Sequence, residues 1–411
     1  MNVLYVSNSW SFSPTHASAV TTYEIVKRLA RKGHKVTVLV PATENRNLLR
    51  KGSVESAMSE NVKVVSLSIS FSANPEKESL IFYGLSCTLL FVPLFLKALK
   101  RGKEYDAVIS MFHPSHLATF FAYLIARVLK VPLLVKVHDL LVDATDPSFL
   151  RRSYKKAMFR FYLAFLKKGD FFLVPSVEWV QLLARVYKVN ERRIVLFRNG
   201  ADAAKFNPHV DCASLRSALN LKKEEKVVLY SGQISRIRGL DYLVQAMVDV
   251  VKEERDVRLL IVGEGGEKPE LVSLVRRMGL DDYVLFKSSV SHDFMPEYTC
   301  LADVAIGPLV ALPITVGTLP IKVIEYMACG KPVVACYDGA SKDLVMDRYN
   351  GILIHSGDVK ELSSALIELL KDADFARSLG VNARKHVERY HDWNVITEEL
   401  DRLLVKHMRV D

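Results

Sequence analysis

The chain has 411 residues and is too long for one ordinary core. Half of its residues are hydrophobic and a quarter are charged, which is typical of soluble globular proteins. Its five scattered cysteines contain no CxxC pair, so they exclude a disulfide framework and a cysteine-ligated zinc site and suit a reducing compartment. Residues 1–200 carry 29 Lys and Arg against 14 Asp and Glu, whereas residues 201–411 carry 27 against 32, so the basic first half predicts an anionic partner.

The first half of the chain predicts strands that alternate with crossover helices. It begins with an apolar run at 2–7 and has no charged segment followed by an apolar stretch, so we expect no secretion signal and a cytoplasmic location. The apolar runs show little alternation, as in strands that are buried on both faces of a parallel sheet. Between the first two runs, 17–32 predicts a helix that ends at Gly33 as a C-cap. The further runs are 35–40, 62–67, 107–111, 133–137, 171–175 and 194–198.

Residues 79–96 are almost wholly apolar and raise the question of a membrane span. They include Gly84, Ser86 and Pro93 and lie at the short end of spanning length. We therefore favour a buried crossover helix over a helix that dips into or crosses a membrane.

Residues 151–168 form a basic segment without an acidic residue. A basic helix with an aromatic face can lie on an anionic bilayer surface, and we favour this interpretation over a solvated helix whose aromatic residues pack on the sheet. Nucleic-acid binding would explain the charge, but no nucleic-acid motif accompanies it, so we expect no such partner. The basic residues are Arg151, Arg152, Lys155, Lys156, Arg160, Lys167 and Lys168, interleaved with Tyr154, Phe159, Phe161, Tyr162 and Phe165.

A second series of apolar runs separated by helical stretches follows. Two successive series of this kind predict an α/β protein with two doubly wound, Rossmann-like domains, which we place at 1–200 and 201–390. Residues 391–411 predict a C-terminal helix that packs back on the first domain. The DxD sequence at 372–374 lies between helices of the tail, away from any strand end, and predicts a helix start rather than a metal site. The runs of the second series are 227–232, 258–263, 284–287, 304–308, 332–337 and 351–354.

The most informative segment is 317–332, GTLPIKVIEYMACGKP, where a polar loop runs into a short helix that begins near Ile321. A helix start carries free N–H groups and a partial positive charge, so the backbone from Thr318 through Leu319 and Pro320 to Ile321 suits a phosphate. Lys322 adds a full positive charge in the first turn. Glu325 lies one turn along on the same side and can accept two hydrogen bonds from a ribose diol, although a plain surface glutamate is the alternative.

Two other loops follow strands of the same domain. In the first, 231–239, Gly232 follows Ser231 and lets the backbone approach a ligand closely. Arg238 can clamp a diphosphate, with Arg236 nearby, and Ser231 is a further donor-binding candidate. The second is the turn at Gly263. Ligands on open α/β sheets bind at the carboxyl ends of the strands, where all three loops fall, so together they predict one anion site.

These segments resemble the retaining glycosyltransferases of family 4, which have the GT-B fold of two Rossmann-like domains facing across a cleft. RNGADAAKF at 198–206 is similar to that family's NGVD…F, SGQISRIRGLDYL to its GRL…KG segment, and IVGEGG to its VGxG turn. PIKVIEYMACGKPVVA is similar to the second half of its E-x7-E signature. In the first half, VHD at 137–139 and MFH at 111–113 resemble the family's strand ends.

The resemblance implies a retaining, metal-independent transfer of a sugar from a nucleoside-diphosphate sugar to an acceptor hydroxyl, without a cofactor. It implies that His138 hydrogen-bonds the donor sugar, with a histidine satisfied within the sheet end as the alternative, and it suggests His16 and His113 on the acceptor side. The catalytic candidates are therefore His138 and Lys322. Together with the basic segment, it suggests a lipid-linked acceptor and a cytoplasmic protein that is peripheral on the inner face of the membrane.

Three positions depart from the family pattern. Gly317 stands where the first signature glutamate is expected, Gln233 stands where an arginine is usual, and SNSWSFSPT at 7–15 lacks a Gly-Gly pair. Gly317 keeps open a catalytically weak nucleotide-sugar-binding partner, and a GT-B sugar-nucleotide epimerase would use the same two domains. A phosphorylase would be expected to carry a pyridoxal-type cofactor lysine, which the sequence does not identify. A nicotinamide dehydrogenase would need G-x-G-x-x-G at the first helix, which neither half supplies.

Overall fold

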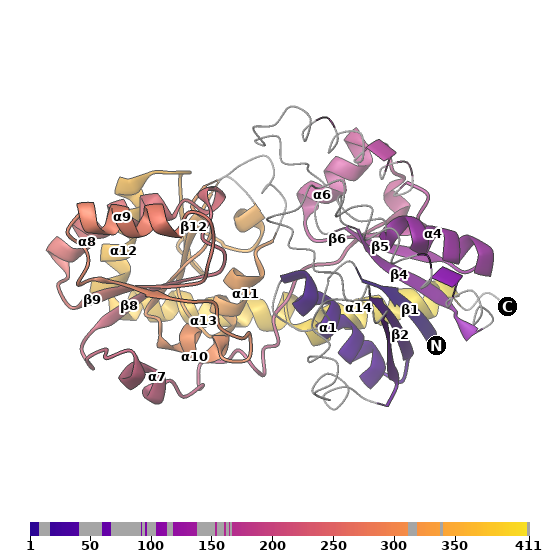
Figure 1. Cartoon of the computed structure of the whole chain (residues 1–411), viewed down its shortest axis with the longest axis horizontal. Coiled ribbons are helices and arrows are strands. Elements are labelled where there is room, and N and C mark those ends of the chain that lie inside the picture. The colour runs from indigo at the N-terminus through magenta and orange to yellow at the C-terminus, as the bar shows by residue number, and fades with distance from the viewer. Residues whose placement is uncertain are drawn as a thin grey trace. The chain divides into compact units, whose positions relative to one another are not determined.

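The computed structural model describes residues 1–7, 17–40, 60–66, 92, 95–96, 104–112, 118–137, 153, 160–161, 164, 167–310, 319–337 and 340–408. The chain divides into two compact units, Met1–Phe197 with Thr397–Asp411, and Arg198–Ile396 (Figure 1). Each unit holds one all-parallel sheet with helices on both faces, as the two series of apolar runs predict.

The sheet of the first unit has seven strands in the order β3-β2-β1-β4-β5-β6-β7. Helices α4 and α6 pack on one face, where they form a core with β4 and β5, and α1 lies on the other face with the C-terminal part of α14 (Figure 1). The elements are β1 (Asn2–Val6), α1 (Ala17–Arg31), β2 (Lys35–Val40), β3 (Val62–Ser66), β4 (Ala107–Phe112), α4 (Ala118–Leu129), β5 (Leu133–Val137), β6 (Phe171–Val174), α6 (Val177–Gln181), its π-helical continuation Leu182–Val186, a 3-10 turn Glu191–Arg193, β7 (Ile194–Leu196) and α14 (Trp393–Met408).

The chain returns to the first unit through α14. Asp401 Oδ1 lies 2.7 Å from His34 Nε2, and Glu398 pairs with Lys32 directly after α1. Gly33 lies between Lys32 and His34, and its φ of +87° marks the end of α1 that the sequence predicts. These contacts tie the last turns of the chain to the end of α1.

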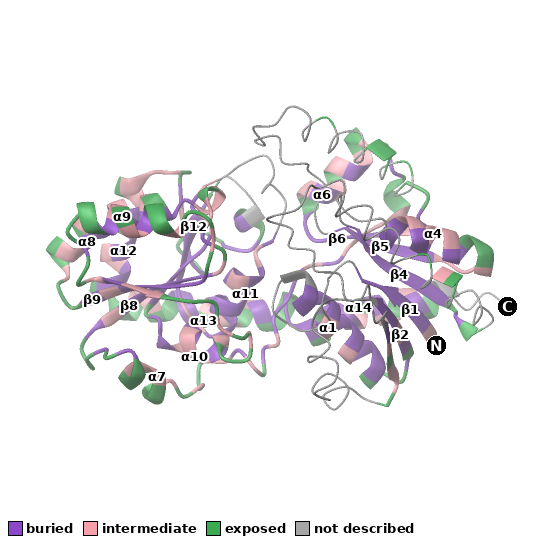
Figure 2. Ribbon diagram, in the orientation of Figure 1, coloured by how far each residue is buried: buried purple, intermediate pink, exposed green. Residues whose placement is uncertain are grey.

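The sheet of the second unit has six strands in the order β10-β9-β8-β11-β12-β13. Helices α8, α9 and α12 cover one face and α10, α11 and α13 the other, and the inner strands β8, β9, β11 and β12 are buried at nearly every residue (Figure 2). The strand order reverses between β8 and β11, the switch point at which ligands bind in such sheets. The elements are α7 (Ala213–Ala218), β8 (Lys226–Ser231), a 3-10 turn Arg236–Arg238, α8 (Leu240–Glu253), β9 (Val257–Val262), α9 (Lys268–Arg277), β10 (Val284–Lys287), α10 (Met295–Leu301), β11 (Val304–Ile306), α11 (Ile321–Ala328), β12 (Val333–Cys336), a 3-10 turn Ala340–Asp343, β13 (Ile352–Ile354), α12 (Val359–Lys371) and α13 (Ala373–Tyr390).

The DxD sequence in the tail starts a helix, as predicted. Asp372 is the N-cap of α13, and its side chain accepts a hydrogen bond from the backbone N–H of Phe375 at 2.9 Å. Across the described ranges, no group of three or more His, Cys, Asp or Glu side chains is arranged to hold a metal ion.

Both segments considered for membrane contact lie mostly outside the described residues. Of 79–96, Phe95 packs against Phe121 with ring centroids 5.9 Å apart, whereas Val92 and Leu96 are exposed. Of 151–168, the described residues, among them Phe161, are exposed. No helix in the part of the chain that the structure describes has the length and apolar character to cross a bilayer.

One buried amine in the first sheet was not predicted. Lys136 on β5 is 1% exposed, and its Nζ lies 4.6 Å from the centroid of the Phe197 ring. Among the described residues it has no hydrogen-bonding or ionic partner. Burial therefore lowers the pKa of Lys136 to about 7.

We expect the Lys136→Met variant to unfold at a higher temperature than the wild type near pH 7. Lys136 has a lower pKa in the folded than in the unfolded state, where it is roughly 10.4, so the unfolded chain binds an extra proton between these values. The buried lysine then lowers the free energy of unfolding by about 4 kcal/mol below pH 7. This loss disappears as the pH rises towards the pKa of lysine in the unfolded chain. Thermal unfolding of both proteins between pH 6.5 and 9.5 measures the gap between their unfolding temperatures, which should narrow as the pH rises. A gap that stays constant across the range would show that Lys136 titrates as it does in the unfolded chain.

Candidate functional site

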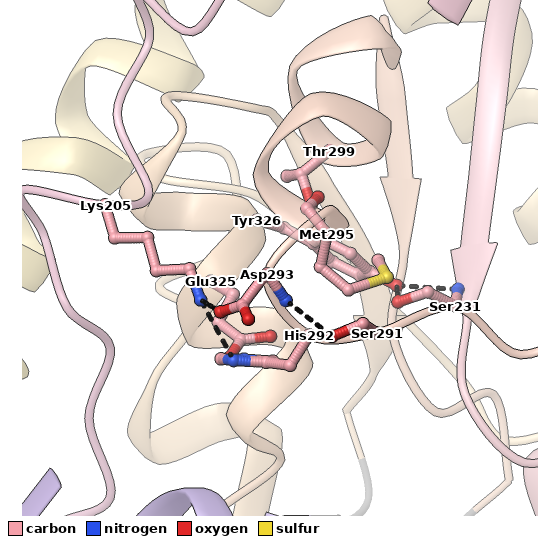
Figure 3. Close-up of polar contacts among 9 residues, drawn as sticks. All are labelled: Lys205, Ser231, Ser291, His292, Asp293, Met295, Thr299, Glu325 and Tyr326. Atoms are coloured by element: carbon pink, nitrogen blue, oxygen red, sulfur yellow. Dashed lines mark hydrogen bonds and ion pairs between the residues drawn. The ribbon is translucent and has the colours of Figure 1, made fainter. Parts of the chain in front are cut away.

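A tyrosine on α11 ties this helix to the carboxyl end of β8. The buried Tyr326 hydroxyl accepts a hydrogen bond from the backbone N–H of Ser231 at 2.8 Å and lies 2.7 Å from Ser231 Oγ (Figure 3). Burial raises the pKa of Tyr326, so the hydroxyl stays protonated. The start of α11 is thereby fixed beside the loop that follows β8, and two of the three predicted loops come together.

The third loop joins them through backbone contact. Gly232 N–H donates to Val262 O at 2.8 Å, and Gly263 follows directly with a φ of +153°. A Cβ on Gly263 would overlap the carbonyl oxygen of Gly232, well inside van der Waals distance. The glycine of this turn therefore permits the close approach of two strand-end loops, in addition to any approach by a ligand.

Lys322 extends from the first turn of α11 back to the end of β8. Its Nζ lies 4.0 Å from the centroid of the Tyr230 ring, and a Cβ on Gly232 would be 2.5 Å from that Nζ. Burial lowers the pKa of Lys322 well below its usual value and the neighbouring Arg238 guanidinium lowers it further, whereas Glu325 acts in the opposite direction. The helix start and the lysine in its first turn are as predicted.

The other cation comes from the 3-10 turn between β8 and α8. Arg238 is partly buried, and its buried Nε finds no hydrogen-bond acceptor among the described residues. The turn ends at Gly239, whose φ of +71° starts α8, and Arg236 in the same turn is exposed. A buried N–H without an acceptor, close to a second cation, is a place where an anion lowers the free energy.

Glu325 lies one turn after Lys322 and is 7% exposed. Its Oε1 lies 2.6 Å from Nε2 of His292, which follows β10 on the way to α10 (Figure 3). On the other side of the ring, His292 Nδ1 lies 3.5 Å from Lys205 Nζ, which donates to Asp293 Oδ1 at 2.8 Å. His292 was not predicted from the sequence; its position just beyond a strand end is the signal that could have identified it.

The remaining predicted donor contacts lie along the approach to α11. The carbonyl of buried Leu319 accepts a hydrogen bond from Asn199 Nδ2 at 2.8 Å, and Pro320 is the N-cap before Ile321. Asn199 belongs to the RNGAD sequence, so this motif supports the helix start. Thr318 and Gly317, and with them His16, His113 and His138, lie outside the described residues.

Two family models match the chain, one over each half. Residues 18–205 match the model described as Glycosyltransferase Family 4, and residues 213–386 match the model described as Glycosyl transferases group 1. Together the two matches span most of both structural units.

Curated relatives and solved structures are also similar to the chain. It is 28% identical to alpha-D-kanosaminyltransferase of Streptomyces kanamyceticus, over 65% of this chain and 68% of that protein. It is 30% identical to D-inositol 3-phosphate glycosyltransferase of Segniliparus rotundus, over 53% and 48%. The chain therefore spans about half to two thirds of these relatives. Sucrose-phosphate synthase from Thermosynechococcus elongatus superimposes over 98% of both chains with a TM-score of 0.75 at 22% identity, and HepE from Anabaena with UDP-glucose over 99% and 100% with a TM-score of 0.73 at 19%.

Proposed function

Because the chain belongs to the family 4 glycosyltransferases with the GT-B fold, we propose that it transfers a sugar, with retention, from a nucleoside-diphosphate sugar to an acceptor hydroxyl. The observation that carries this proposal is the pairing of Lys322 with Arg238 at the carboxyl edge of the second sheet. Lys322 and the neighbouring Arg238 guanidinium, which has a buried N–H lacking an acceptor, fit the two phosphates of such a donor.

The chemistry follows from where negative charge develops. As the bond between the sugar and the diphosphate breaks, the leaving diphosphate gains charge that Lys322, Arg238 and the N–H groups at the start of α11 stabilise. Each cation contributes about 2–4 kcal/mol to the transition state when water is excluded. Neither residue needs a metal ion for this role, and the proposal includes none.

Glu325 and three histidines complete the proposed assignments. Glu325 accepts hydrogen bonds from the nucleoside ribose, and His138 contacts the donor sugar, while His16 and His113 line the acceptor side. Since Gly317 offers no carboxylate, the contact that the first signature glutamate would make to the donor sugar comes from another group or is absent. Solved neighbours of the GT-B fold contain UDP or UDP-glucose, so UDP sugars are the first donors to test.

For the acceptor, we propose a phosphorylated or lipid-linked molecule at an anionic membrane surface. The first half of the chain is basic, and curated relatives include D-inositol 3-phosphate glycosyltransferases. Neutralising Arg151, Arg152, Lys155 and Lys156 together should weaken sedimentation with anionic vesicles. Unchanged sedimentation would remove the membrane surface from the proposal.

Thermal unfolding with UDP, GDP and ADP sugars, followed by product analysis, tests the function. One nucleotide should raise the unfolding temperature, because a ligand at about 100 times its Kd stabilises by about 2.7 kcal/mol. Release of the nucleoside diphosphate only with an acceptor present supports the transferase. A donor isomerised or hydrolysed without acceptor indicates the epimerase, and a donor that binds but stays intact indicates a binding partner. No stabilisation by any nucleotide sugar would contradict the proposal.

A further inference from the structure

The carboxylate of Glu325 has two neighbours with which it can interact, Lys322 and His292, and the two interactions have different consequences for donor binding. Lys322 lies one turn earlier on α11, close enough for Glu325 to stabilise its charged form. His292, 33 positions earlier in the chain, lies 2.6 Å from Oε1. A carboxylate that paired with Lys322 would neutralise the cation that the diphosphate requires. The hydrogen bond to His292 holds the carboxylate in another direction.

The contacts around His292 define which ring nitrogen carries the proton. Lys205 Nζ can only donate, so Nδ1 of His292, 3.5 Å away, accepts. Nε2 then carries the hydrogen and donates it to Glu325 Oε1. Lys205 is itself held by Asp293 Oδ1 at 2.8 Å, and the His292 ring packs against Phe206 with centroids 5.3 Å apart (Figure 3 shows the polar contacts).

These contacts leave part of the carboxylate for a ligand. Among the described residues, Oε2 of Glu325 has no hydrogen-bond donor, and Oε1 keeps a second lone pair. Lys205 and Phe206 come from the segment after the RNGAD sequence, whereas His292 follows β10 and Glu325 is on α11. Three separate segments thus converge to orient one carboxylate.

We propose that His292 is a positioning residue for donor binding: through Nε2–H it directs Glu325 towards the nucleoside ribose and keeps it from pairing with Lys322. The proposal rests on the proposed function, since it assigns the ribose to Glu325. The arrangement Asp293–Lys205–His292–Glu325 selects nucleotides with ribose hydroxyls.

The test compares binding of UDP with binding of 2′,3′-dideoxy-UDP, or of the matching GDP or ADP pair if another base is preferred. The wild type should prefer the ribose form by about tenfold, the value of hydrogen bonds to a charged group. His292→Leu removes the donor to Glu325 and should bind both forms equally, with a higher KM for the donor sugar and a smaller change in kcat. A residue with only a structural role would weaken both nucleotides alike.

Conservative and control variants make the result specific. His292→Gln can donate to Glu325 and accept from Lys205, so it should restore most of the preference for ribose. Lys205→Met removes the donor that fixes the tautomer and should reduce the preference partly. His355→Leu removes the exposed histidine that pairs with Glu361 at 2.8 Å and should leave the preference unchanged.

The possible outcomes distinguish failure of the proposed function from failure of the positioning role of His292. If the wild type binds no nucleotide, the proposed function fails. If the wild type prefers ribose and His292→Leu keeps that preference, the positioning role is wrong although the function stands. A His292→Gln variant that loses the preference as fully as His292→Leu would overturn the hydrogen-bond argument. If His292→Leu does not fold, His292→Gln and Lys205→Met still decide between these results.

Discussion

Replacing Lys322 with methionine should lower kcat/KM for the nucleotide-sugar donor by about 10²–10³-fold, the usual effect of removing one group that stabilises transition-state charge. Methionine is close to lysine in length and in the apolar character of its stem but carries no charge. The loss should appear in kcat as well as in KM, because the diphosphate gains charge as it leaves. Steady-state kinetics with varied donor measure both values.

The stability of this variant distinguishes a ligand-binding lysine from a structural one. Lys322 is a desolvated amine beside Arg238, and its removal relieves the repulsion between them. The unfolding temperature should therefore stay level or rise. Lys385→Met, which removes an exposed lysine of α13, is the matched control and should change neither activity nor stability. A parallel loss of stability and activity in Lys322→Met would show that the lysine supports the fold.

The fold was predictable because its strands are continuous apolar runs. The predicted ranges 35–40 and 133–137 coincide with β2 and β5, and Val36, Val38 and Leu39 of β2 and every residue of β5 are buried. The predicted ends of the strands were less accurate where apolar residues continue beyond the strand into the following loop. The run at 304–308 gives a strand of only three residues, Val304–Ile306, because Pro308 has no N–H with which to extend the ladder.

The site was predictable only where its signal is local. The start of α11 and its lysine follow from the pattern of one segment, GTLPIKVIE. His292 is joined to Glu325 across 33 positions, and neither residue indicates the other in the sequence. Lys136 was also missed, because a run of apolar residues predicts a buried strand but not that a charged residue within it is buried as well.

The contact between the loops after β8 and β9 gives the second large effect that we expect. Gly263→Ala should lower the stability of the second unit by about 3 kcal/mol or more, an exceptional value for one methyl group. The added Cβ would overlap a backbone carbonyl, which cannot rotate away as the end of a flexible side chain can. The φ of +153° adds strain of its own for any residue with a side chain.

Donor binding should weaken in the same variant, since the displaced loop carries Gly232, which adjoins Lys322 Nζ. Gly266→Ala is a matched control three residues along, because nothing lies within 4 Å of its added Cβ and its backbone is not in the left-handed region. It should bind donor normally and unfold at the same or a slightly higher temperature. Thermal unfolding and nucleotide titration of both variants test the argument. If Gly263→Ala matches Gly266→Ala in both measurements, the two loops are not held in backbone contact, and the placement of Gly232 beside Lys322 loses its support.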